Sequence, residues 1–117
     1  MLQAIETKFG TIYVEDLHSQ RPEEDRIKIF DSGMNYMDYF SLDSLESCAE
    51  EGGHTIEDEL AIRVENFKQC DTIEDLVGSI FWTWDFITKD PTEIEPYLES
   101  NEWLNQIGDY YIVIPEC

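Results

Sequence analysis

The sequence predicts an α+β fold: an antiparallel sheet of about four to five strands, formed by an N-terminal meander and a C-terminal strand, with two to three helices packed on one face. Three observations predict it. Short β-prone segments separated by turns occupy the first third of the chain, two amphipathic segments with threonine caps follow, and an apolar run lies near the end. With 117 residues, the chain has the size of a single domain, residues 1–117, with one core.

Four β-prone segments make up the expected meander. The first two flank a turn at Phe9-Gly10, and the alternation of Ile12 and Val14 with polar neighbours is typical of a half-buried strand. The third follows a charged, proline-containing loop over residues 18–25, and the fourth follows the turn at Ser32-Gly33. The expected strands cover residues 4–7, 11–15, 26–31 and 36–42.

Two helices are expected after residues 43–54, whose Ser, Glu and Gly content predicts a loop with at most a short helical turn. Thr55 and Thr72 each precede Ile-Glu-Asp, which is typical of an N-cap followed by an acidic first turn. Apolar residues at helical spacing then predict a core-facing stripe in each helix. The stripes comprise Ile56, Leu60, Val64 and Phe67 in the first, and Ile73, Leu76, Val77, Ile80, Phe81 and Trp84 in the second.

The C-terminal part predicts one more helix and one more strand. The Asp90-Pro91 pair ends the second helix, because proline cannot extend a helix and restricts the residue before it. A short helix over residues 96–107 is expected to stop at Gly108. Residues 110–114 are strongly apolar and predict a terminal strand inside the sheet.

The charge is strongly acidic: 27 Asp and Glu against 7 Lys and Arg give a formal net charge of -20. The aromatic content of 13% argues against acidic disorder. Because a long-range repulsive field opposes the approach of nucleic acid and of anionic lipid, we expect neither as a direct ligand. A basic protein surface is the partner that this charge predicts.

The expected location is the cytoplasm. The first residues contain no basic region followed by an apolar run, and no later stretch approaches 18 apolar residues. Cys48, Cys70 and Cys117 are an odd number without close pairing, which favours free thiols over a disulfide framework.

No catalytic or cofactor motif is apparent, so we expect no enzyme, no cofactor and no metal site. His18 and His54 each lie in an expected loop, outside any spacing that nucleophilic catalysis or zinc binding requires, and are interpreted as solvated. The glycines form no phosphate-binding loop. An enzyme acting on a cationic substrate remains a further alternative.

The acids are clustered along the chain. Nine lie between Lys28 and Arg63 and seven follow Lys89, without a base between them. Clustering matters because even spreading over an expected surface of roughly 6,600 Å² leaves about 240 Å² per carboxylate, against roughly 100 Å² per phosphate on duplex DNA. Ordinary solvated faces are the alternative explanation.

Two aromatic residues suggest an anchor beside the acids. At 100° per residue, Trp82 and Phe86 project from the second helix opposite its core stripe, near Asp75 and Ser79. Exposed aromatic side chains ringed by acids are typical of a hot spot for a basic surface. The alternative is that this helix is sandwiched between the sheet and another element.

In size, acidity and lack of a catalytic motif, the chain resembles the small inhibitors that phages and mobile elements direct against host defence nucleases, namely anti-CRISPR and antirestriction proteins. The resemblance implies an acidic inhibitor that occupies a basic nucleic-acid-binding surface, with nucleic-acid mimicry as one mode. The alternative is another interaction module, such as an immunity protein against a basic toxin, or a regulatory subunit. The residues expected to bind the partner are Glu50, Glu51, Glu57, Asp58, Glu59, Asp90, Glu93, Glu95, Glu99, Glu102, Trp82 and Phe86.

Overall fold

The four expected N-terminal strands form one antiparallel sheet in chain order, which confirms the meander. They are β1 (Leu2–Glu6), β2 (Thr11–Glu15), β3 (Arg26–Phe30) and β4 (Tyr36–Ser41). Inward residues such as Ile12 and Val14 are fully buried, as their alternation predicts. This computed structural model describes residues 2–15, 26–81, 84–97 and 103–114.

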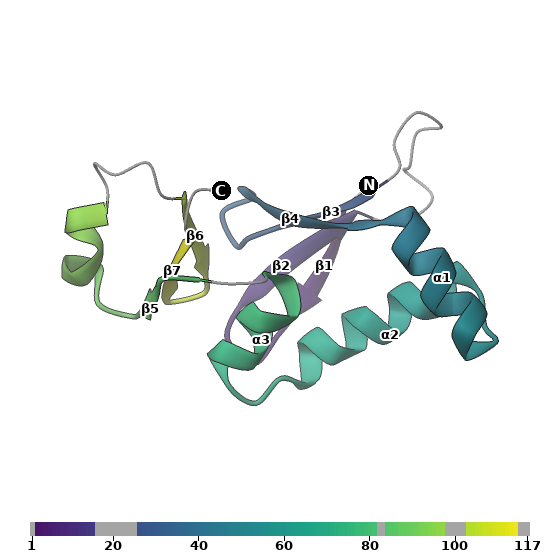
Figure 1. Cartoon of the computed structure of the whole chain (residues 1–117). Coiled ribbons are helices and arrows are strands. Elements are labelled where there is room, and N and C mark those ends of the chain that lie inside the picture. Colours follow the sequence, from purple (N-terminus) through teal and green to yellow (C-terminus); the bar gives the residue numbers. More distant parts are fainter. Residues whose placement is uncertain (1, 16–25, 82–83, 98–102, 115–117) are drawn as a thin grey trace.

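Two helices lie across one face of this sheet, as Figure 1 shows. They are α2 (Ile56–Gln69) and α3 (Ile73–Ile80). Both begin where the sequence predicts: Thr55 Oγ1 accepts a hydrogen bond from Asp58 N at 3.1 Å, and Thr72 Oγ1 accepts one from Asp75 N at 3.1 Å. The predicted stripes face the core, although Phe81 and Trp84 of the second stripe lie beyond the end of α3. The stripe residues that are buried are Leu60, Val64, Phe67, Ile73, Leu76, Val77, Ile80 and Phe81.

The expected loop over residues 43–54 is instead largely a helix, α1 (Leu42–Gly52). Ser41 caps its first turn by accepting a hydrogen bond from Ser44 N, and Gly53 ends it with a φ of 69°. Leu45 and Ala49 lie four residues apart and are buried, so they form a short apolar stripe on one face of the helix. This stripe favours a helix more strongly than the Ser, Glu and Gly content favours a loop.

The second predicted helix is shorter than expected, because α3 ends at Ile80 and Phe81 is already extended with a φ of -113°. The residues that follow are largely aromatic and β-branched, and such residues favour extended backbone over helix. Phe86 consequently lies in a strand, β5 (Phe86–Thr88), and its prediction as a helical residue was wrong. Trp84 still packs against the core.

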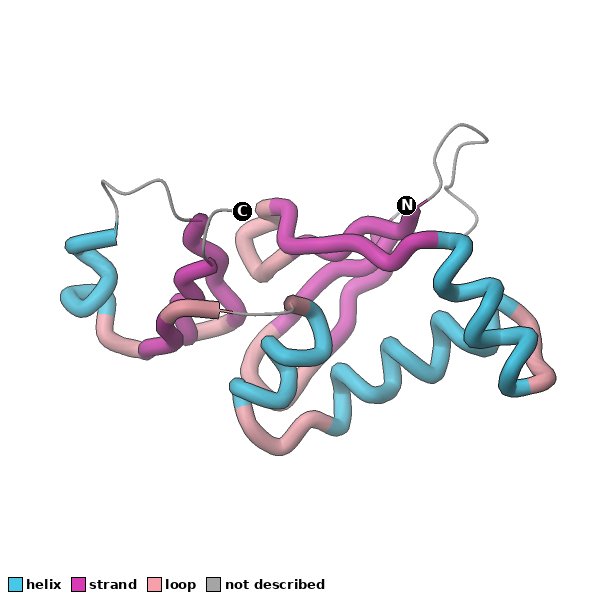
Figure 2. The backbone as a smooth tube through the Cα atoms, viewed as in Figure 1, coloured by secondary structure: helices cyan, strands magenta, loops and turns pink. Residues whose placement is uncertain are grey.

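The C-terminal residues form a second antiparallel sheet of three strands, which Figure 2 shows beside the first. It consists of β5, β6 (Trp103–Ile107) and β7 (Tyr110–Ile114), with a 3-10 helix, η2 (Pro91–Tyr97), between β5 and β6. The prediction of a helix over residues 96–107 was therefore wrong. Gly108, with a φ of 57°, makes a hairpin turn between β6 and β7, where Ile107 pairs with Tyr110.

The predicted C-terminal strand is an inner strand, but of the second sheet. In that sheet β7 pairs with β5 on one side and with β6 on the other. Its Ile112 and Ile114 belong to the same core cluster as Ile5 and Ile12 of the first sheet. Both sheets thus share one core, although they do not share a hydrogen-bond ladder.

A buried carboxylate joins the two sheets. Asp31, with no exposed surface, accepts hydrogen bonds through Oδ1 from Gly33 N and Asn35 N, both at 2.9 Å. Its Oδ2 accepts from Asn105 Nδ2 at 2.9 Å and from Gln106 N at 3.0 Å. Four donors replace the water that the carboxylate loses on burial, so the β3–β4 loop and β6 are held together.

Candidate protein-binding face

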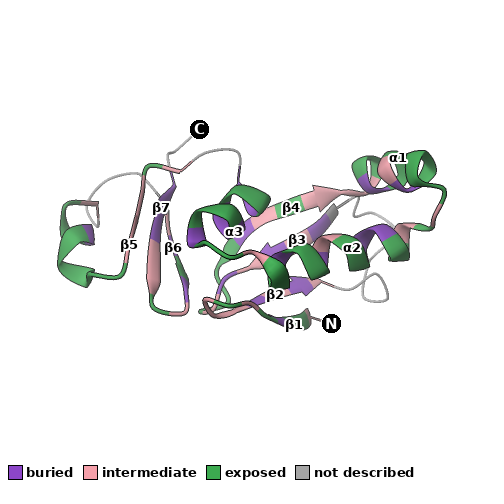
Figure 3. Cartoon of the chain, turned by 90° about the horizontal axis from the view of Figure 1, so that it is seen from below, coloured by how far each residue is buried: buried purple, intermediate pink, exposed green. Residues whose placement is uncertain are grey.

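The three α-helices and the turn between α2 and α3 carry many exposed acidic residues, and Figure 3 shows the exposed parts of these helices in green. The opposite faces of the same helices supply the core. We call the following exposed residues the acidic layer: Asp43, Glu46, Glu50, Glu51, Glu57, Asp58, Glu65, Asp71, Glu74 and Asp75.

Three cations of the described residues already have a partner. Lys8 forms an ion pair with Asp71, and Arg63 contacts Glu59. Lys89 lies over the Tyr110 ring, 4.9 Å from its centroid. Within the described part of the three helices, Lys68 is the one cation for which no ion pair is found. The acidic layer is therefore only weakly neutralised.

A groove of about 680 Å³ runs between α2 and α3 within the acidic layer. Asp71, Glu74 and Asp75 line it together with the partly buried Trp84. The hydrogen bond and charge of Lys8 hold the pKa of Asp71 below its ordinary value, so that carboxylate is already paired. Glu74 and Asp75 beside an indole form a site suited to a lysine or arginine side chain.

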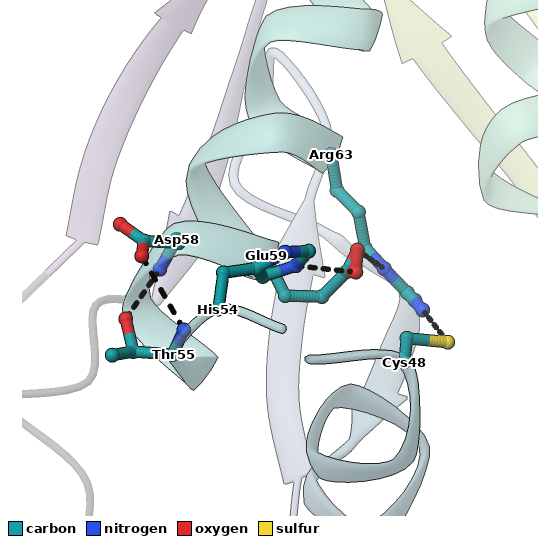
Figure 4. Close-up of polar contacts among 6 residues, drawn as sticks. All are labelled: Cys48, His54, Thr55, Asp58, Glu59 and Arg63. Atoms are coloured by element: carbon teal, nitrogen blue, oxygen red, sulfur yellow. Dashed lines mark hydrogen bonds and ion pairs between the residues drawn. The ribbon is translucent and has the colours of Figure 1, made fainter. Parts of the chain in front are cut away.

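Four residues form a polar network at the α1–α2 junction, shown in Figure 4. His54 Nε2 lies 3.2 Å from Glu59 Oε1, and Arg63 Nε donates to Glu59 Oε2 at 3.4 Å. Arg63 also donates to Cys48 Sγ at 3.4 Å and stacks over Phe40, 4.8 Å from the ring centroid. The network ties α1 and α2 to the sheet.

This network corrects two sequence-based interpretations. Glu59 is only 9% exposed and both its oxygens are engaged, so it stabilises the fold and does not present a carboxylate to a partner. His54, interpreted as a solvated loop residue, is half-buried beside Glu59. The other histidine, His18, lies outside the described residues.

The first predicted acidic cluster comes together at the α1–α2 junction. Glu50 and Glu51 lie in the last turn of α1, and Glu57 and Asp58 in the first turn of α2, all exposed. Asp58 also stabilises the start of α2, because its Oδ2 accepts a hydrogen bond from Thr55 N at 3.3 Å and completes a capping box.

The second predicted cluster lies at the other end of the molecule, so the two do not share a site. Asp90, Glu93 and Glu95 are exposed at the start of η2, which Figure 1 places far from the α1–α2 junction. Hydrogen bonds from Thr92 lower the pKa of Asp90. Of the remaining residues in this prediction, Glu99 and Glu102 lie outside the described part of the chain.

The predicted aromatic anchor is only partly placed. Trp82 lies outside the described residues. Phe86 is half-buried in β5, its ring 5.9 Å from that of Tyr97, and is not among the residues that line the α2–α3 groove. Trp84, which the sequence assigns to the core, packs against the core and also lines the α2–α3 groove, with its ring near Gly78.

Sequence reasoning missed Glu65, Glu74 and Asp75 as site residues. Arg63 and Lys68 on α2 interrupt the run of acids along the chain. For this reason the sequence does not reveal that these acids lie close to the other acids in space. A helical projection finds part of the signal, because Glu65 shares the outer face of α2 with Asp58 and with Ile62, which is 47% exposed.

The described residues give no support for other kinds of site. Among them, no group of three His, Cys, Asp or Glu side chains could hold a metal ion. No helix there is long and apolar enough to cross a membrane. Cys48 and Cys70 carry free thiols. Comparison with protein-family models, with curated proteins and with solved structures finds no match to this chain.

Proposed function

We propose that this protein binds a basic surface of a nucleic-acid-binding protein, such as a nuclease, and prevents nucleic acid from binding there. The observation that carries the proposal is the acidic layer: of its ten exposed carboxylates, nine lie on the three helices and Asp71 lies between α2 and α3, and the described part of these helices holds one lysine without an ion pair. An ordinary protein surface mixes charges of both signs. A surface this one-sided favours a partner of the opposite sign.

The α2–α3 groove adds a contact that charge alone does not provide. Complementary potentials accelerate encounter, but they are screened by salt and leave dissociation fast. Trp84, beside Glu74 and Asp75, offers a cation a ring face as well as carboxylates. Such a contact slows dissociation, which is what an inhibitor that competes with nucleic acid requires.

The competition is tested with the basic protein that the immobilised chain captures from a lysate of its native host at 50 mM NaCl and releases at 500 mM. Duplex DNA or single-stranded RNA is then added to the complex. We expect a nucleic-acid-binding protein that exchanges this chain for nucleic acid. A captured partner that binds nucleic acid equally well in the complex overturns the proposal and leaves a general interaction module, such as an immunity protein or regulatory subunit.

Two charge variants test the acidic layer as the contact surface. The first carries Glu65→Gln, Glu74→Gln and Asp75→Asn, all exposed in the layer; the control carries Glu6→Gln, Glu95→Gln and Asp109→Asn, all exposed elsewhere. Both lose the same three negative charges. We expect the first to associate about tenfold more slowly and the control about twofold. Equal effects in stopped-flow binding would show that only net charge matters and would reject the layer.

A further inference from the structure

A second groove, of about 740 Å³, lies between β4 and the C-terminal end of α3, and we call it the β4–α3 groove. Residues 38–41 form one wall and residues 78–81 form the other. The α2–α3 groove reaches the same part of α3, because Gly78 and Ser79 line both cavities. Each volume is within the range of about 300–1,000 Å³ that is typical of ligand clefts. The two grooves are therefore neighbours that meet on α3.

The boundary between the two grooves is low. Gly78 has no side chain, and Ser79 is short and exposed. Ser79 Oγ donates to the Asp75 carbonyl oxygen at 2.8 Å, so the hydroxyl lies against its own helix. A Cβ atom added at Gly78 would lie 3.6 Å from Trp84 Cζ3, which places the indole beside this boundary. At these two positions α3 presents no side chain larger than that of serine, so an extended chain has room to cross.

Each groove offers a carboxylate to a cation. In the β4–α3 groove, the Asp38 carboxylate is half-buried, burial raises its pKa, and no ion pair to it is found among the described residues. Arg63 lines the same groove, but its guanidinium already contacts Glu59. In the α2–α3 groove, Asp75 and the Trp84 ring line the cavity together. An incoming lysine or arginine is thus favoured in both grooves, by a partly desolvated carboxylate in one and by a carboxylate with a ring face in the other.

We propose that the two grooves form one continuous site for an extended segment of the basic partner, with one lysine or arginine against Asp38 and a second against Asp75 and Trp84. The inference rests on the proposed function and names its binding mode. When one chain supplies both cations, binding of the first raises the effective concentration of the second. The affinity then depends on the separation of the two cations along the segment, which simple attraction between opposite charges does not require.

The test uses the intact protein and a series of peptides that each contain two arginines, separated by up to about six alternating glycine and serine residues. All of the peptides carry the same charge. We expect the affinity, measured by titrating the amide resonances of residues 38–41 and 74–79, to be at least about tenfold higher at one intermediate separation than for adjacent arginines. Both sets of resonances should respond to the same peptide. An affinity that does not change with the separation overturns the continuous site.

A change in either arginine tests whether both grooves are occupied at once. Citrulline has nearly the shape of arginine but carries no charge. Replacing either arginine of the best peptide by citrulline should weaken binding about tenfold. A peptide in which one of the two replacements has no effect occupies a single groove and also overturns the continuous site.

Two variants separate the boundary between the grooves from general charge. Ser79→Phe places a ring across the boundary; the control Ala61→Phe adds a ring at an exposed position of α2 that is not among the residues lining either groove. We expect Ser79→Phe to weaken the best peptide about tenfold and Ala61→Phe less than about twofold. Equal effects reject the site. Because neither variant removes a carboxylate, the partner experiment with the Glu65, Glu74 and Asp75 variant still tests the proposed function when the peptide test fails.

Discussion

Asp38 is a carboxylate whose ionisation opposes folding. Its environment on β4 raises its pKa because burial removes water from the charged form, and the hydrogen bond from Tyr39 N offsets only part of that cost. A carboxyl with a raised pKa in the folded state contributes stability below its ordinary pKa of 3.8. That contribution is lost as the pH rises through the folded-state value.

Asp38→Asn should therefore stabilise the protein at pH 7. The amide keeps an oxygen to accept the hydrogen bond from Tyr39 N but carries no charge. We expect Tm to rise by about 2 °C at pH 7, since the side chain is only half-buried, and the gain to shrink as the pH falls towards 3.8. Thermal unfolding from pH 7 to pH 4 measures it, with Asp109→Asn, exposed in the β6–β7 turn, as control. A lower Tm at pH 7, or a gain independent of pH, would contradict this account.

Two hairpin turns of different sheets meet backbone to backbone, at Gly10 and Gly108. A side chain at Gly108 would collide with the carbonyl oxygen of Phe9, and one at Gly10 would collide with the backbone of Gly108. Both glycines have positive φ, 155° and 57°. Each of the two positions therefore requires glycine for two reasons: the backbone has a positive φ, and no room is left for a Cβ atom.

Gly108→Ala should be much more damaging than Gly53→Ala. Gly53 has a similar φ of 69° but nothing within 4 Å of an added Cβ, so it isolates the conformational cost of roughly 1 kcal/mol. At Gly108 the collision adds to that cost, and we expect a loss of about 3 kcal/mol or more. Urea denaturation of both variants measures the difference. Equal losses would mean that the two turns separate without cost.

At the scale of helices and strands, the N-cap residues and the apolar stripes in the sequence predicted the two helices that pack on the first sheet. Thr55 and Thr72 start helices because each supplies a side-chain acceptor, and neither depends on distant contacts. The helix α1 was missed because its stripe is short. The strand β6 was missed because Asn105, a buried polar residue in the strand, breaks the alternation that marks a half-buried strand, and its burial depends on Asp31, 74 residues away.

At the scale of the molecule, the position of the acids matters more than their number. The accessible surface of 7094 Å², shared by 27 carboxylates, allows each about 260 Å², against roughly 100 Å² per phosphate of duplex DNA. The net charge predicted a basic partner. The position of the acidic layer could not be predicted from the sequence, because the layer forms only when α1, α2 and α3 pack together. The two clusters chosen from chain order lie far apart.

Replacing Asp31 should weaken the whole molecule, since its carboxylate joins the sheets. Asp31→Asn places an amide group against backbone or side-chain donors that need an acceptor, and we expect a loss of about 3 kcal/mol in the free energy of unfolding. Exposed Asp109→Asn, in the β6–β7 turn, should change it by less than about 0.5 kcal/mol. A loss below about 1 kcal/mol for Asp31→Asn would show that the sheets hold together without it.

The same carboxylate sets an order of events during synthesis. Its partners Asn105 and Gln106 leave the ribosome 74 and 75 residues after it, so two of its four hydrogen bonds, those that join the sheets, can form only late in synthesis. Contacts of such separation slow folding, because a long loop must close before they form. The acidic helices α1 to α3 emerge in that interval, before Asp31 can join the two sheets.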